Sequence, residues 1–237
     1  MCIRDSYGFR APNGISSVVF RKENGDLSGR VFIADSGRHE IFALSLDGSV
    51  KEVFGRKLFV EPRGIVAFRD EKQKDTYHLY VSDQRSADKG AIFYLKIVPP
   101  KTYYRKVGTI KGEIESIAVA RERNLVIVAN ESRRRLEYLN VSTGEIVGAV
   151  GEGIFLGEPE GLVLIQKDGP RIIALDQSAV GRILVFGPGP SSVTVYGTQP
   201  KLRQPDGLCL SSSYLFAVSE DRKIFQILLE ALLRPKS

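Results

Sequence analysis

Carboxylate side chains at a repeated position are the part of this sequence best suited to chemistry. A phrase Pro-x-Gly-aliphatic, or a close variant of it, occurs five times, and its x residue is polar each time. The x residues, in chain order, are Asn13, Arg63, Glu115, Glu160 and Asp206. Carboxylate oxygens are hard ligands that suit calcium or magnesium. Glu160 and Asp206 stand in consecutive copies, so we expect a cation or a neighbouring Arg to offset their mutual repulsion.

A second polar set follows the hydrophobic run that comes after each phrase. We expect the last residues of these runs, Asp35, Asp83, Asn130 and Asp176, to cap turns. The polar residues just beyond the runs are Arg38, Arg85, Lys89, Glu131, Arg133, Gln177, Glu220 and Arg222. Arginine forks suit phosphate or carboxylate groups. In a four-stranded meander alternate connections fall on opposite faces, so both polar sets should share one face.

The spacing of the phrase predicts the architecture that must position these residues. The x residues lie 45 to 52 residues apart, and the intervening sequence reads as short strands. Such a period is typical of a β-propeller. In the first copy we expect strands over residues 15–20, 31–34, 39–46 and 50–54, with an Asp-Gly hairpin turn at 47–48. Four antiparallel strands must pack against neighbouring copies to cover both of their faces.

The later copies repeat this plan with variations. Residues 61–110 have longer connections at 70–76 and 84–90, and residues 114–150 and 159–196 form the next two copies. The copy that starts at Pro205 has three readable strands, followed by a short helix near residues 228–233. We therefore predict an all-β propeller of four-stranded antiparallel blades, with five blades visible. We expect it to be a fragment of a six-bladed propeller, the alternative being a closed ring of five.

Composition sets the outer limits on function. Residues 1–6 resemble the translation of a sequencing adapter, so we expect one propeller domain over residues 7–237, truncated at its N-terminus. Hydrophobic residues make up 43% of the chain, and no apolar run is long enough to span a membrane. The net charge of +6 permits attraction to phosphates, although it is equally ordinary for a soluble domain.

Several other chemistries lack their sequence signatures. His39 and His78 fall in different copies, show no metal-ligand spacing and are expected at the surface. There is no nucleophile elbow, no Cys-x-x-Cys pair and no Gly-rich phosphate loop before a helix. The basic strands typical of nucleic-acid binders are absent too, so no nucleic-acid partner is predicted. The arginine run at 133–135 reads as a solvated loop.

The motifs of individual copies resemble two propeller families. The first copy, Ala11-Pro12-Asn13-Gly14-Ile15 followed by residues 31–41 and Asp47-Gly48, resembles an NHL-type repeat. From about residue 114 onward the chain is more similar to β-propeller phytases and their phytase-like relatives. That resemblance is carried by Asn130-Glu131, Glu160-Gly161-Leu162, Asp176-Gln177, Pro205-Asp206-Gly207-Leu208 and residues 216–221. Residues 83–90 also look like a phosphate-binding loop of that family.

The phytase resemblance implies a calcium-dependent phosphomonoester hydrolase acting on inositol phosphates. It assigns calcium ligands to Glu131, Glu160, Asp206 and Glu115, and phosphate contacts to Arg85, Lys89 and Arg38. Calcium is then the expected cofactor, and a phosphorylated small molecule or another anionic ligand is the expected partner. A secreted or periplasmic location would also follow from this resemblance.

Two departures keep other functions open. The family's early acidic motifs would fall near Asn13 and Arg63, where this sequence has an amide and a cation. This favours the alternative of a non-catalytic NHL-like propeller that binds a ligand or a protein on the same face. A third reading is a gluconolactonase-like hydrolase, because that family also combines Pro-Asn-Gly with Pro-Asp-Gly. In that family the two phrases should open adjacent blades, whereas Asn13 and Asp206 are four copies apart.

Overall fold

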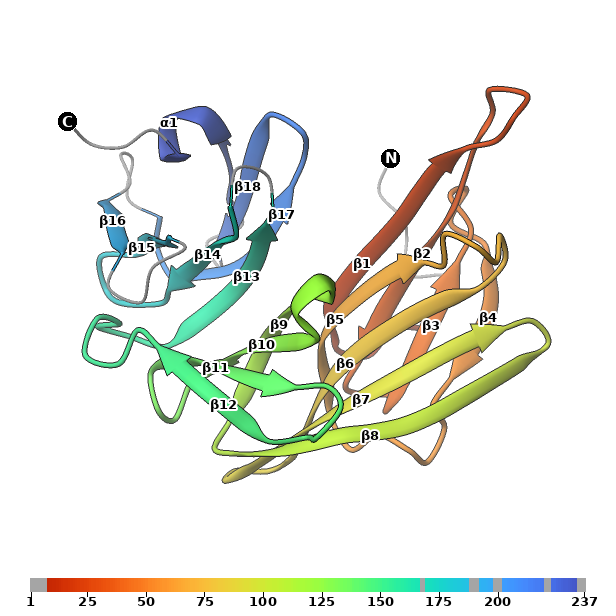
Figure 1. Cartoon of the computed structure of the whole chain (residues 1–237), viewed down its shortest axis with the longest axis horizontal. Coiled ribbons are helices and arrows are strands. Elements are labelled where there is room, and N and C mark those ends of the chain that lie inside the picture. The colour runs from red at the N-terminus through yellow and green to blue at the C-terminus, as the bar shows by residue number, and fades with distance from the viewer. Residues whose placement is uncertain (1–7, 167–168, 188–191, 198–201, 220–222, 234–237) are drawn as a thin grey trace. The chain divides into compact units, whose positions relative to one another are not determined.

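The computed structural model describes residues 8–166, 169–187, 192–197, 202–219 and 223–233. The described strands form five antiparallel sheets, in each of which neighbouring strands follow one another along the chain (Figure 1). The chain divides into two compact units, residues 1–114 with 141–145 and residues 115–140 with 146–237.

The first unit contains two four-stranded sheets. The first sheet consists of β1 (Pro12–Arg21), β2 (Leu27–Asp35), β3 (Glu40–Leu44) and β4 (Val50–Phe54). The second sheet consists of β5 (Pro62–Arg69), β6 (Tyr77–Ser86), β7 (Lys89–Val98) and β8 (Lys101–Lys111). The innermost strands β1 and β5 lie side by side, because the backbone N–H of Ala67 donates to Ser16 Oγ at 3.0 Å.

The second unit carries the remaining sheets. The third sheet consists of β9 (Ile114–Ala120), β10 (Leu125–Asn130), β11 (Arg135–Asn140) and β12 (Ile146–Val150), with a 3-10 turn at Arg121–Arg123. The fourth consists of β13 (Pro159–Ile165), β14 (Arg171–Asp176), β15 (Arg182–Phe186) and β16 (Val193–Gly197). The fifth has three described strands, β17 (Pro205–Leu210), β18 (Tyr214–Ser219) and β19 (Lys223–Leu228), followed by helix α1 (Leu229–Leu233).

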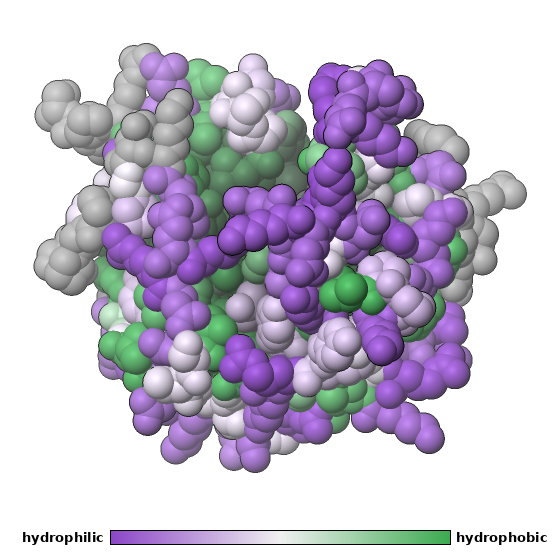
Figure 2. Space-filling view, turned by 45° about the vertical axis from the view of Figure 1, so that its right-hand side comes forward, coloured by the Kyte–Doolittle hydropathy of each residue, from purple (hydrophilic) through white to green (hydrophobic). Residues whose placement is uncertain are grey.

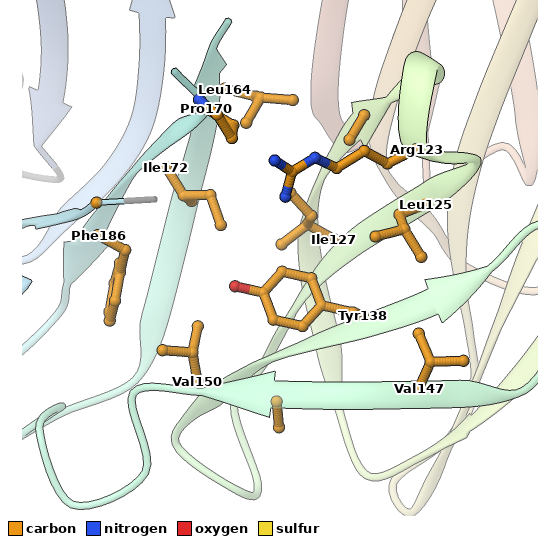
Figure 3. A pocket seen from close by; sticks show the side chains of 13 residues that line it. Arg123, Leu125, Ile127, Tyr138, Val147, Val150, Leu164, Pro170, Ile172 and Phe186 are labelled. Carbon is orange, nitrogen blue, oxygen red and sulfur yellow. The ribbon is translucent and has the colours of Figure 1, made fainter. Parts of the chain in front are cut away.

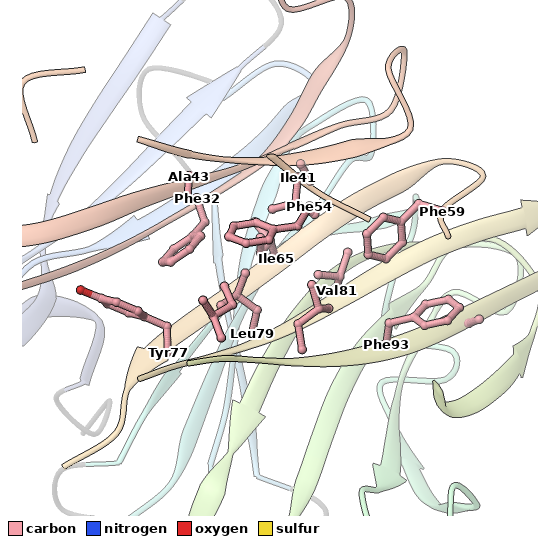
Figure 4. Packing of buried hydrophobic residues seen from close by; sticks show 14 residues of the cluster. Phe32, Ile41, Ala43, Phe54, Phe59, Ile65, Tyr77, Leu79, Val81 and Phe93 are labelled. Carbon is pink, nitrogen blue, oxygen red and sulfur yellow. The ribbon is translucent and has the colours of Figure 1, made fainter. Parts of the chain in front are cut away.

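Apolar side chains between successive sheets form the cores. In the first unit Phe32 and Phe54 of the first sheet pack against Leu79 and Phe93 of the second (Figure 4). In the second unit one cluster joins the third and fourth sheets and another joins the fourth and fifth. Each sheet thus buries its apolar face on its neighbour, as expected for blades that cannot cover themselves.

A buried aspartate at the end of the second strand fixes the start of the first strand in three sheets. Asp35, Asp83 and Asp176 are fully buried. The Asp83 carboxylate accepts hydrogen bonds from the backbone N–H groups of Val60 and Glu61 at 2.9 and 2.8 Å. Asp35 holds residues 10 and 11 in the same way, and Asp176 holds residues 156 and 157. These aspartates therefore clamp the segment that leads into the innermost strand, beyond the turn capping expected from sequence.

The predicted all-β architecture of five antiparallel blades is confirmed, including the incomplete last blade and the short helix after it. The sixth blade stays a prediction. None of the described helices is both long and apolar enough to span a membrane. The face seen in Figure 2 is largely hydrophilic, with hydrophobic residues gathered in smaller areas, in line with a chain of 26% charged residues.

The expected long connection at residues 84–90 is wrong. β6 continues to Ser86 and β7 begins at Lys89, so only residues 87 and 88 form the turn. Gln84 pairs with Gly90 in the strand register. The polar composition of this stretch suggested a loop, but these residues form a hairpin end whose side chains are exposed from Arg85 to Lys89. The predicted phosphate-binding loop is therefore the tip of a hairpin.

Candidate functional site

Four of the five x residues, Asn13, Arg63, Glu160 and Asp206, lie in β-bulges. In β13, Pro159 pairs with Asp176 and Leu162 with Ala174, so Glu160 and Gly161 together oppose one residue of β14. Asp206 is the extra residue of a similar bulge in β17, because Pro205 pairs with Ser219 and Gly207 with Val218. A bulge re-aims the side chain that it contains. The phrase thus gives Glu160 and Asp206 a direction that a regular strand would not give them.

The strands that carry Glu115, Glu160 and Asp206 follow one another in space within the second unit. The backbone N–H of Leu162 on β13 donates to Ser116 Oγ on β9 at 3.1 Å. On the other side of β13, a Cβ added to Gly161 would lie 2.6 Å from the backbone nitrogen of Leu208 on β17. This glycine is needed for close approach of the next strand. The three x carboxylates therefore belong to neighbouring strands.

Glu160 is a buried carboxyl group surrounded by other acids. Glu160 is only 7% exposed, and its side chain forms no hydrogen bond or ion pair with any described residue. Burial, and then the charges of Glu115, Glu131, Asp206 and Glu158, raise the pKa of Glu160 to about 10. At neutral pH this carboxyl group therefore keeps its proton unless a cation takes the proton's place.

A second buried glutamate of the same unit has the opposite surroundings. Glu137 is fully buried, and its carboxylate oxygen Oε1 lies 2.9 Å from Arg133 Nη1 and 2.7 Å from Arg135 Nη2. Asn130 Nδ2 also donates to Glu137 Oε2 at 3.1 Å. Sequence reasoning missed this site by treating residues 133–135 as a solvated loop. The alternation of Arg135 and Glu137 on one strand face was the available signal.

The donor set around Glu160 fits a hard divalent cation in chemistry and charge. Glu115, Glu131 and Asp206 supply only oxygen ligands, and Asp206 is exposed while Glu115 and Glu131 are half-buried. No three His, Cys, Asp or Glu side chains among the described residues converge to hold a metal ion as they stand. Cation binding would therefore require these carboxylates to turn toward Glu160. The assignment of Glu131, Glu160, Asp206 and Glu115 as metal ligands stays a prediction.

The predicted phosphate-binding residues belong to the first unit, whereas the predicted calcium ligands belong to the second. Arg85 Nη1 lies 2.7 Å from Asp83 Oδ2 and also donates to the Leu58 carbonyl at 2.9 Å. Arg38 Nη1 donates to the Gly8 carbonyl at 2.9 Å. Lys89 is exposed at the first position of β7. Both arginines thus stabilise their own sheet, and their phosphate-binding role stays a prediction.

The x position of the second copy is occupied by a cation with its own partners. Arg63 Nη2 lies 2.9 Å from Glu61 Oε1 and 3.0 Å from Glu113 Oε1. Asn13, the x residue of the first copy, is exposed. The first unit therefore has no carboxylate at either of its x positions. Of the remaining predicted face residues, Glu220 and Arg222 lie outside the described residues.

One histidine differs from expectation. His39 is exposed, but the side chain of His78 is only 15% exposed, and its Nε2 lies 3.0 Å from Asp70 Oδ2. Its ring stacks on Phe68 and its Nδ1 is 2.6 Å from the Tyr94 hydroxyl. The hydrogen bond from His78 to Asp70, followed by those from the backbone N–H groups of residues 72 and 73, lowers the pKa of Asp70 to about 2. His78 therefore helps to pack the second sheet.

Together the five sheets of consecutive antiparallel strands define this chain as a β-propeller. No protein-family model and no curated protein matches the sequence. Solved structures match the fold. A structure described as the nidogen/laminin complex has a TM-score of 0.67 at 15% identity, over 93% of this chain and 76% of that chain.

Two further solved structures share the fold. A catalytically inactive virginiamycin B lyase from Staphylococcus aureus with quinupristin has a TM-score of 0.55 at 10% identity, over 95% of this chain and 86% of that chain. A protein of unknown function from Bacteroides caccae has a TM-score of 0.59 at 8% identity, over 93% and 82%. At such identities the likeness concerns the fold alone. The similar structures include a protein complex and a lyase, so the fold itself does not select an activity.

Proposed function

We propose that this chain is a calcium-binding propeller whose cation site is built around Glu160, and that the bound cation recruits an anionic, phosphorylated small molecule. The observation that carries the proposal is the contrast between two buried glutamates. Glu137 has two arginines against its carboxylate, whereas Glu160 is surrounded by four acids. A buried acid among acids is costly in its charged form unless a cation joins it.

In this proposal Glu160, Asp206, Glu131 and Glu115 hold the calcium ion. Calcium supplies positive charge for phosphate oxygens and Lewis-acid polarisation of a phosphoryl group. Within this chain, the bulges at Glu160 and Asp206 aim the carboxylates, and the clamp by Asp176 fixes the segment before Glu160. Hydrolysis of inositol phosphates, as in the phytase-like reading, is the activity that we assign to such a site.

Calcium-dependent thermal unfolding tests the cation site. Calcium should raise the Tm of the wild-type chain by mass action, equivalent to about 2.7 kcal/mol at 100 times its Kd. The double variant Glu160→Gln with Asp206→Asn should lose that increase. The matched control is Glu122→Gln with Glu145→Gln, which removes two exposed acids and should keep it. An equal calcium shift in all three proteins would exclude the site.

A second candidate function is binding without catalysis, and Arg63 favours it. Its ion pairs with Glu61 and Glu113 place a neutralised cation where a multi-calcium site would need a carboxylate. Release of phosphate from inositol hexakisphosphate, with and without calcium, separates the two candidates. Calcium-dependent release that Glu160→Gln abolishes supports the hydrolase. Retained calcium stabilisation without any release supports a binding propeller.

A further inference from the structure

A separate pocket lies between the third and fourth sheets of the second unit. Its volume is about 330 Å³, within the range of small-molecule sites. Figure 3 shows apolar side chains from both sheets around it. The main apolar lining residues are Leu125, Ile127, Val150, Leu164, Ile172 and Phe186.

Two polar side chains face this apolar space. The guanidinium group of Arg123 extends from the 3-10 turn, and the hydroxyl of Tyr138 extends from β11, both toward the pocket interior (Figure 3). Neither group forms a hydrogen bond or an ion pair with a described residue. Burial raises the pKa of the Tyr138 hydroxyl above its ordinary value, so this group remains a hydrogen-bond donor at neutral pH.

The ordinary explanation of an unpaired arginine is that water solvates it at the surface. Arg123 is exposed, but the described residues that line the pocket include no acid to balance its charge. A cation and a phenol at one side of an apolar space together match a ligand with an apolar body and a single anionic group. Arginine binds a carboxylate through two parallel hydrogen bonds, and a nearby hydroxyl can donate a third.

We infer that this pocket binds a small flat apolar molecule carrying one carboxylate, which the Arg123 guanidinium and the Tyr138 hydroxyl receive. The apolar body would lie against Ile127, Ile172 and Phe186. The pocket is distinct from the carboxylate cluster. Glu160 is the second residue of β13 and Leu164 the sixth, so the two sites are about 13 Å apart along the strand. The inference is thus independent of the calcium proposal.

Binding of 2-naphthoate and of its neutral analogue 2-naphthamide tests the inference, and titration calorimetry can follow both. We expect naphthoate to bind about tenfold or more tightly than the amide, which corresponds to one charge-assisted contact. Arg123→Gln should remove this preference while the amide still binds. Tyr138→Phe should weaken naphthoate binding and leave the apolar contacts in place.

Two further variants separate the pocket from unspecific effects. Arg121→Gln, in the same 3-10 turn but outside the lining, should leave the preference for naphthoate intact. Ala149→Trp, at an exposed lining position, should fill the space and reduce binding of both molecules at least tenfold. Equal affinity for the acid and the amide, no binding of naphthoate, or an unchanged preference in Arg123→Gln would each overturn the inference.

Discussion

At the scale of single residues, the surroundings of a buried carboxyl group decide whether it carries charge. Glu137 lies against Arg133 and Arg135, whose charges compensate its own. The hydrogen bond that Arg135 donates to Glu137, followed by the one it donates to Glu152, raises the pKa of the Arg135 guanidinium. Glu160 lacks such a partner among the described residues and its pKa rises to about 10. One unit thus contains a structural ion pair and an uncompensated acid.

The first prediction concerns the pH dependence caused by Glu160. Its pKa is about 10 in the folded chain and about 4.5 for an ordinary glutamate, so only the folded chain keeps the proton between these values. The free energy of unfolding should therefore fall as pH rises above about 4.5, by at most about 1.4 kcal/mol per pH unit. Glu160→Gln should remove this decline. Urea unfolding with a calcium chelator, from pH 4 to 9, measures it.

The Glu122→Gln variant and the wild-type chain are the controls for that experiment. Glu122→Gln removes an exposed acid from the same unit and should follow the wild-type pH curve. Wild type and Glu160→Gln should have similar stability near pH 4, where both side chains are neutral, and diverge above it. Parallel curves for these two proteins over the whole range would mean that Glu160 ionises normally in the folded chain.

At the scale of the elements, the aspartate clamp of the first, second and fourth sheets links the second strand to the segment before the first strand. In the second sheet this clamp is Asp83, which also pairs with Arg85 at 2.7 Å. A carboxylate that accepts backbone N–H groups satisfies donors that the bulged start of the strand leaves unpaired. The clamp therefore explains why the second strand ends in Asp in three of the five sheets.

The second prediction is that Asp83→Ala destabilises the first unit by about 3 to 5 kcal/mol. It would leave the N–H groups of Val60 and Glu61 and the Arg85 cation without their buried partner. Chemical unfolding followed by circular dichroism measures the loss. Asp88→Ala, at the exposed turn of the same hairpin, should change stability by less than about 0.5 kcal/mol. Similar losses in the two variants would argue against the clamp.

The third prediction concerns the glycine beside Glu160. In Gly161→Ala the new Cβ would lie 2.6 Å from the Leu208 nitrogen, so β13 and β17 must separate. We expect a loss of about 1 to 3 kcal/mol and weaker calcium stabilisation, because Asp206 moves away with β17. Gly197→Ala, which meets no atom within 4 Å, is the control. A Gly161→Ala chain as stable as the control would contradict the close approach of these strands.

The sequence predicts the blades well because their period and apolar runs are local signals. The expected strand over residues 50–54 coincides with β4, and the strand expected over residues 31–34 lies within β2. Pairing between distant side chains is harder to predict. Arg133 and Arg135 compensate Glu137, whereas no described residue compensates Glu160, and this difference depends on bulges and strand register. The hairpin end at residues 84–90 was missed because polar strand ends and polar loops have the same composition.

At the scale of the whole molecule, the fifth sheet differs from the others because it has three described strands, so its third strand β19 lies at the sheet edge. β19 pairs with β18, and its Ile224 is 74% exposed. Exposed strand edges with apolar side chains promote association between chains. In the six-bladed reading, a further strand would complete this blade. The net charge of +6 opposes association, because like-charged chains repel one another.

The fourth prediction is that Ile224→Lys reduces self-association without loss of stability. The new charge lies on an exposed strand, where lysine opposes edge-to-edge pairing. Light scattering at rising protein concentration measures the effect, with Leu46→Lys, at an exposed turn position of the first sheet, as the control for added charge. An equal improvement in both variants would point to net charge alone and not to the strand edge.

The buried proton on Glu160 has a consequence for how the proposed calcium site responds to its surroundings. Calcium can bind there only as the proton leaves, so loading the site is an exchange of one ion for another. Below the pKa of Glu160, apparent calcium affinity would then rise by up to about tenfold for each unit by which the pH increases. The heat of binding would also vary with the ionisation enthalpy of the buffer, since the buffer receives the released proton. Acidic surroundings would empty the site and alkaline ones would fill it.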